Sequence, residues 1–220
     1  MNLRPGDLGR LRTFDGPTLS DAIENLTGRD RTTGFAGSDI RCLDPEISPM
    51  IGFAVTATVD CTKPGPWPGR GKQSDLWRLL ETAPKPAVVV LQHPGPNPER
   101  ASVFGDVVAT IAQRFGAVGL VTDGSVRDFP AIRQLRFGVW ARGTVTSRGN
   151  NTTLSVGGEV TLSGMNVTTG DLVFADTNGV VLIPKATALD DLFREVAKVR
   201  EADAERIQLI TTPDFTIERL

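Results

Sequence analysis

Two neighbouring side chains near the middle of the chain have the chemistry to bind an anion and a cation. Arg127 and Asp128 stand side by side just before Pro130. The guanidinium of Arg127 is a planar fork that suits a carboxylate or a phosphate, and the carboxylate of Asp128 offers hard oxygen ligands for a divalent cation. A plainer interpretation is equally open, in which Asp128 caps a helix that starts near Pro130 and Arg127 is a surface cation.

The elements around this pair place it at the edge of a sheet. The apolar run of residues 119–121 predicts the end of a buried strand, and the Asp123-Gly124 pair predicts a turn after it. Polar groups at the C-terminal end of a strand are where α/β sheets usually bind ligands. The pair therefore stands where a ligand would be expected.

A second candidate is the start of a helix at residues 105–108, which read Gly-Asp-Val-Val. The unpaired N–H groups of a helix start suit an anion, although Asp106 could also serve only to stabilise the helix dipole. This helix leads through Gly116 into the strand that precedes Arg127, so the two elements run antiparallel. We therefore expect Gly105 and Arg127 to lie at one sheet edge and to converge on one ligand.

The rest of the chain predicts an α/β fold in a single domain, residues 1–220. Strands and helices alternate from about residue 53 to 141, which favours a parallel or mixed sheet with helical cover, and residues 152–184 predict a β-rich C-terminal half. A C-terminal helix at about 187–207 has one apolar face, which could dock on the sheet or on a neighbouring subunit. We also expect helices at 18–26, 74–83 (capped by Ser74 or Asp75) and 107–115, a half-buried strand at 53–60, and buried strands at 87–92 and 117–122.

Composition narrows the classes of partner. The balance of 24 basic against 26 acidic residues gives no electrostatic footprint for nucleic acid and no polybasic patch for a membrane. The N-terminus has no apolar targeting segment, and the spacing of Cys42, Cys61 and the single histidine fits neither a disulfide framework nor a zinc site. We expect a soluble, cytoplasmic protein that binds small molecules or proteins.

Three other motifs are weaker candidates. The glycine-rich loop before Ser74 is not a nucleotide-binding P-loop, because Pro66 stands where its first glycine should be and Gln73 stands where its Ser or Thr should be. Lys72 or Arg70 could still reach a substrate from this loop, but a solvated lid is the simpler interpretation. His93 has no Ser or Cys partner in a recognisable frame and is interpreted as a loop residue. Arg142 could add charge to the pocket, but we expect it to pair with a surface carboxylate.

Taken together, residues 105–108, 123–128 and 140–143 resemble the family of regulator of ribonuclease E activity A (RraA) and 4-hydroxy-4-methyl-2-oxoglutarate aldolase. Residues 18–22 and 170–184 are similar to its first helix and closing strands, so the resemblance covers roughly residues 14–200. It implies a swivelling β/β/α domain, assembled as a homotrimer or hexamer with sites at subunit interfaces.

The resemblance also implies a metal-dependent, class II lyase that acts on 2-oxo acids. Arg127 would hold the substrate's carboxylate or keto oxygen, and Asp128 would hold Mg²⁺ or Mn²⁺. Cleavage of the bond beta to the keto group leaves a pyruvate enolate, which the metal and the guanidinium stabilise, and oxaloacetate would be decarboxylated through the same enolate. Asp106 could orient a metal-bound water as proton carrier, by its position alone. The substrate's main-chain contacts would come from Gly105, Asp106, Val107 and Val108.

Departures from the family pattern concern the substrate. Ala131 stands where aldolases often carry an acidic residue, and both the loop before Ser74 and residues 144–163 differ from the aldolase pattern. The alternative function is a non-catalytic regulator that binds ribonuclease E, but a pure binding module has no need of an aspartate beside the arginine. An older family label, menaquinone methyltransferase, is excluded because no glycine-rich cofactor fingerprint follows the first strand.

Overall fold

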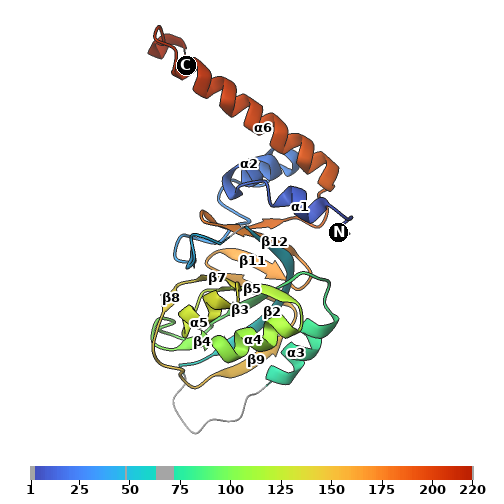
Figure 1. Ribbon diagram of the computed structural model, residues 1–220, viewed down its shortest axis with the longest axis vertical. Coiled ribbons are helices and arrows are strands. Elements are labelled where there is room, and N and C mark those ends of the chain that lie inside the picture. The colour runs from blue at the N-terminus through green and yellow to red at the C-terminus, as the bar shows by residue number, and fades with distance from the viewer. Residues whose placement is uncertain (1–2, 48, 63–71, 220) are drawn as a thin grey trace.

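A mixed β-sheet forms the centre of the computed structural model, which describes residues 3–47, 49–62 and 72–219 (Figure 1). Its order is β1-β7-β5-β3-β2-β12-β13, and β9 also pairs with β2. The four strands β2, β3, β5 and β7 are parallel to one another, and the remaining pairings are antiparallel. The bounds are β1 (Arg41–Cys42), β2 (Met50–Asp60), β3 (Ala87–Gln92), β5 (Ala117–Thr122), β7 (Gly138–Ala141), β9 (Thr152–Val156), β12 (Leu172–Asp176) and β13 (Gly179–Ile183). The predicted mixed sheet and β-rich C-terminal half are confirmed.

Both faces of this sheet are covered. On one face, Val89 and Leu91 of β3 belong to a core shared with α3 (Gln73–Thr82), α4 (Asp106–Arg114) and α5 (Phe129–Gln134). On the other face, Val88 and Val90 pack with the hairpin of β10 (Glu159–Leu162) and β11 (Met165–Thr168). Burial on two faces explains the continuous apolar run of β3.

Two local predictions were wrong. Strand β2 is buried along nearly its whole length, not half-buried, because it lies inside the sheet; its polar Thr56 is accommodated by donating a hydrogen bond to the Gly158 carbonyl at 2.8 Å. Helix α3 starts at Gln73, and neither Ser74 nor Asp75 caps it, because Lys72 holds the N-cap position and makes no side-chain cap bond.

A third core joins the two ends of the chain. Helices α1 (Asp7–Leu11) and α2 (Gly16–Thr27) pack with the first half of α6 (Leu189–Ile210), and Phe53 and Phe174 of the sheet complete the cluster. The second half of α6 extends away from the body (Figure 1), and residues 201–208 are all exposed. The chain closes with a short helix, η1 (Ile217–Arg219). No helix in the described residues is long and apolar enough to span a membrane.

A second, small sheet positions the candidate site. It is parallel, in the order β4-β6-β8, and was not predicted from the sequence. Each of its strands follows the C-terminal end of β3, β5 or β7 in the large sheet, and β4 and β6 each lead directly into a helix or its first turn. Gly105 therefore follows one strand and Arg127 the next. The bounds are β4 (Ser102–Phe104), β6 (Ser125–Val126) and β8 (Gly143–Thr144).

Candidate functional site

The small sheet brings Gly105 and Arg127 together. Strands β4 and β6 run side by side, and the Arg127 N–H donates a hydrogen bond to the Phe104 carbonyl at 3.0 Å. A Cβ atom on Gly105 would lie 2.9 Å from Oδ2 of Asp128 and 3.3 Å from Nε of Arg127. The start of α4 therefore faces the Arg127-Asp128 pair at contact distance. The convergence inferred from chain connectivity is present in the structure, while what these groups bind stays a prediction.

Asp128 does not use its carboxylate as a helix cap. It holds the N-cap position of α5 in the left-handed conformation, with φ of 56°, and makes no side-chain cap hydrogen bond. Few residues other than glycine adopt this conformation, and Asp and Asn do so most readily. Its Oδ2 lies 3.0 Å from Nε of Arg127, and the two side chains are 37 % and 34 % exposed. The carboxylate is thus directed to the arginine and to α4, where solvent and ligands can reach it.

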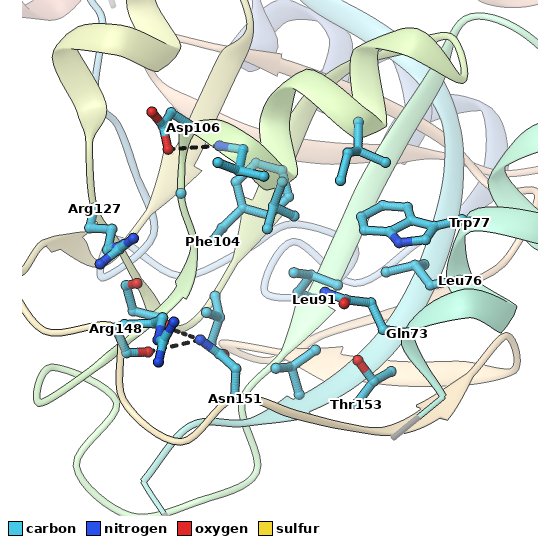
Figure 2. A pocket seen from close by; sticks show the side chains of 17 residues that line it. Gln73, Leu76, Trp77, Leu91, Phe104, Asp106, Arg127, Arg148, Asn151 and Thr153 are labelled. Carbon is cyan, nitrogen blue, oxygen red and sulfur yellow. Dashed lines mark hydrogen bonds between the residues drawn. The ribbon is translucent and has the colours of Figure 1, made fainter. Parts of the chain in front are cut away.

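The start of α4 is partly occupied by its own side chain. The Oδ1 atom of Asp106 accepts a hydrogen bond from the Val107 N–H at 2.7 Å (Figure 2). The Val107 N–H is one of the main-chain donors predicted to bind substrate, so it would have to exchange the Asp106 carboxylate for a ligand. Asp106 remains partly exposed beside Arg127, and its role as a proton carrier stays a prediction.

A cavity of about 320 Å³ is lined by Gly105, Asp106 and Arg127, whereas Asp128 is not among its lining residues. Figure 2 shows Arg127 and Arg148 on one side and Trp77 with Leu76 on the other. The cavity therefore combines a charged end, which contains two arginines and Asp106, with an apolar wall. The full lining is Val59, Gln73, Leu76, Trp77, Leu91, Ser102, Val103, Phe104, Gly105, Asp106, Val107, Val108, Ile111, Arg127, Arg148, Asn151 and Thr153.

The sequence analysis did not predict several of these lining residues. Trp77 lies in the helix predicted at 74–83, which the sequence analysis did not connect with the site, yet it is half-buried and faces the cavity. Arg148 and Asn151 lie in an irregular segment that carries no periodic signal. The amide of Asn151 ties that segment to the site, because its Nδ2 donates to the carbonyls of Ser102 at 2.9 Å and of Arg148 at 2.8 Å. Its Oδ1 is buried and has no hydrogen-bond partner.

His93 supports the turn behind the site. Its main-chain N–H donates to Oδ1 of Asp123 at 2.7 Å, and its Nε2 accepts from the Cys61 N–H at 3.4 Å and lies 3.9 Å from Oδ1 of Asp60. His93 does follow β3 as a loop residue, but its side chain is fully buried. Burial also raises the pKa of Asp123 above its ordinary range.

The remaining candidates lie outside the cavity. Arg142 pairs with Asp39 at 2.7 Å, as expected, and its Nε donates to the Asp123 carbonyl at 3.1 Å. Lys72 is exposed before α3 and does not line the cavity, whereas Arg70 and the rest of the loop at 63–71 lie outside the described residues.

The donor set near Asp128 suits a hard, hydrated cation. No group of three or more His, Cys, Asp or Glu side chains that could hold a metal occurs in the part of the chain that the structure describes. Mg²⁺ is commonly held by only one or two carboxylates, with water and substrate oxygens completing its shell. The accessible carboxylate of Asp128, which caps no helix, fits that mode of binding. A closed structural zinc site would need four protein ligands, and a single carboxylate does not fit it.

Comparison with known proteins places the chain in a family. The model of the RraA-like family, described as aldolase/RraA, matches residues 16–182. A proposed 4-hydroxy-4-methyl-2-oxoglutarate aldolase of Halalkalibacterium halodurans is 28 % identical over 197 residues, which cover 89 % of this chain and 84 % of that protein.

Solved structures show the same fold. RraAS2 of Streptomyces coelicolor, an unusual member of the RNase ES inhibitor RraA family, has a TM-score of 0.74 at 22 % identity, covering 94 % of this chain and all of that one. An uncharacterised protein of Pseudomonas syringae pv. tomato also has a TM-score of 0.74, at 20 % identity, covering 100 % of this chain and 94 % of that one. The predicted RraA-like fold is confirmed.

Proposed function

The chain belongs to the aldolase/RraA family, and we propose that it is a metal-dependent lyase that cleaves 2-oxo acids to release pyruvate. The observation that carries the proposal is the position of the Asp128 carboxylate, which makes no helix-cap hydrogen bond and lies against Arg127 and the start of α4. The substrates we propose are 4-hydroxy-4-methyl-2-oxoglutarate or a similar acid, and oxaloacetate. The name of the Halalkalibacterium halodurans relative supports the aldolase assignment.

Each group has a distinct task in this proposal. Arg127 holds the carboxylate or keto oxygen of the substrate, and N–H groups at the start of α4 orient it. Asp128 would hold Mg²⁺ or Mn²⁺, which would supply Lewis-acid stabilisation of the enolate charge when bound. When the carbon–carbon bond beta to the keto group breaks, its electron pair moves toward that oxygen, where the Arg127 guanidinium stabilises the charge. In an aldol substrate, a water oriented by Asp106 accepts the proton of the hydroxyl that becomes a carbonyl and delivers a proton to the carbon that has lost its bond. In oxaloacetate that carbon loses CO₂, and the same water supplies its proton.

The test is the Asp128→Asn variant with oxaloacetate as substrate and Mn²⁺ as metal. Asparagine tolerates the left-handed conformation, so the backbone is preserved while the negative charge is lost. We expect weaker Mn²⁺ binding by calorimetry and a fall in kcat/KM for pyruvate release of about 100-fold or more. Asp75→Asn is the matched control, because Asp75 is an exposed residue of α3 that does not line the cavity. Turnover that is independent of metal, or full activity in Asp128→Asn, would exclude this role.

A second function is supported by the likeness to the Streptomyces coelicolor RNase ES inhibitor family. Under this alternative the chain is a non-catalytic regulator that binds ribonuclease E by protein contact. The two functions separate in one pair of measurements. Tight ribonuclease E binding that survives Asp128→Asn, together with no pyruvate release from either substrate, would favour the regulator.

We further propose that the chain assembles as a homotrimer or hexamer. The protruding half of α6 supports assembly, because Ile207 and Ile210 are 62 % and 43 % exposed there. Light scattering coupled to size-exclusion chromatography would measure the mass, and a monomer at micromolar concentration would contradict the proposal.

A further inference from the structure

The cavity continues well past the groups that would hold a 2-oxo acid. Figure 2 shows Trp77 and Leu76 of α3 and Leu91 of β3 on the side away from Arg127, and Ile111 of α4 also lines the cavity. Leu76 and Leu91 are 3 % and 2 % exposed, so they form a packed wall that cannot turn toward solvent. The volume of about 320 Å³ falls within the range of sites that enclose a whole small molecule.

Charge and apolar surface are segregated within this cavity. The charged lining residues are Asp106, Arg127 and Arg148, and Figure 2 shows all three on the side opposite Trp77. Among the residues that the structure describes, the polar lining groups beside Trp77 are uncharged, those of Gln73 and Thr153. A carboxylate placed at the Trp77 end would lose its water without gaining a cationic partner from these described groups, which is strongly unfavourable.

We propose that the 2-oxo acid of this protein carries an apolar substituent, aromatic or branched aliphatic, that packs against Trp77. The inference rests on the proposed function, because it takes the Arg127 side as the place of the oxo-acid group. Short dicarboxylates can still bind at the cationic side between Arg127 and Arg148. They leave the Trp77 wall in contact with water, and a substituent that covers the wall adds favourable burial.

Calorimetry with two ligands tests the proposal. Pyruvate and 2-oxo-4-phenylbutanoate, each titrated with Mn²⁺ present, share the oxo-acid group and differ only in the apolar tail. We expect the phenyl ligand to bind about tenfold tighter or better, since a few buried CH₂ groups suffice for that factor. In Trp77→Ala the two ligands should bind with nearly equal affinity, whereas Trp77→Phe should keep the preference for the phenyl ligand. The affinity for pyruvate should stay unchanged in both variants. Ile111→Ala, on the facing helix, should reduce the preference in the same direction.

The outcomes separate the two claims. Pyruvate binding without a preference for the phenyl ligand overturns this inference and leaves the proposed lyase intact. A preference that is unchanged in both Trp77→Ala and Ile111→Ala also overturns it. Failure of both ligands to bind overturns the inference and the proposed function together.

Discussion

Replacing Gly105 by alanine puts one methyl group between helix α4 and the Asp128 carboxylate. The backbone of Gly105 has φ of −144°, which alanine adopts without strain, so the effect comes from contact alone. The new Cβ would lie 2.9 Å from Oδ2 of Asp128, and ordinary contact begins near 3.4 Å. The carboxylate must therefore retreat by about 0.5 Å, or the helix start must move by the same amount.

A shift of this size predicts a clear loss of catalysis with little loss of stability. Misplacing a reacting group by about 1 Å can cost about 100-fold, so half that displacement should lower kcat/KM for pyruvate release about tenfold. Mn²⁺ affinity should also fall, because Asp128 is the proposed ligand. The free energy of unfolding should change by less than about 1 kcal/mol, since the crowded Arg127 side chain is flexible and alanine is only moderately worse than glycine at an N-cap.

Gly143→Ala is the matched control. Gly143 starts the next strand of the same small sheet, and a Cβ there meets nothing within 4 Å. Both variants would be compared by pyruvate release from oxaloacetate, Mn²⁺ calorimetry and urea unfolding. Wild-type kcat/KM in Gly105→Ala would refute the argument that catalysis depends on the position of the Asp128 carboxylate.

Three further outcomes follow from burial. Burial raises the pKa of Asp123, so the stability that its protonated carboxyl contributes is full below the ordinary pKa of about 3.9 and is lost as pH rises through the raised pKa. In urea titrations, Asp123→Asn should therefore gain stability relative to the wild type as pH rises above about 4. A stability difference that does not grow with pH would contradict this. Burial raises the pKa of Cys61 to about 12, so Ellman's reagent at pH 8 should modify the half-buried Cys42 first, and prior labelling of Cys61 would count against the packing. In protein diluted to the monomer, Leu192→Ala should cost about 2–5 kcal/mol of unfolding free energy and Ile207→Ala less than about 0.5 kcal/mol; equal costs would mean that the end of α6 packs against its own chain.

The sequence predicted the site's location because chain connectivity determines it. A helix that leads into a parallel strand must start at the edge where that strand ends, so connectivity alone predicts that Gly105 lies near Arg127. Apolar periodicity likewise located the long elements. Strand β3 and helix α6 were predicted within a few residues of their observed bounds.

The features that the sequence did not predict depend on the rotation of a helix about its axis and on contacts between segments that are distant in the chain. The strands of the small sheet have two or three residues each, too few for any periodic signal. The aspartate before Pro130 looked equally suited to capping, and only the left-handed backbone at Asp128 shows that its carboxylate points elsewhere. Trp77 belongs to an apolar stripe, yet the exact rotation of α3 decides whether its ring faces the core or the cavity.

The small sheet also determines when the site exists during folding and unfolding. Each of its two ladders pairs only two residues of one strand with two of the next, so closing the loop between the strands gains little stabilisation. The long, doubly covered ladder between β2 and β3 has no such weakness. The site should therefore close last and open first: the Arg127 N–H should exchange with solvent faster than the amides of β3, and mild urea should inactivate the protein before the large sheet unfolds.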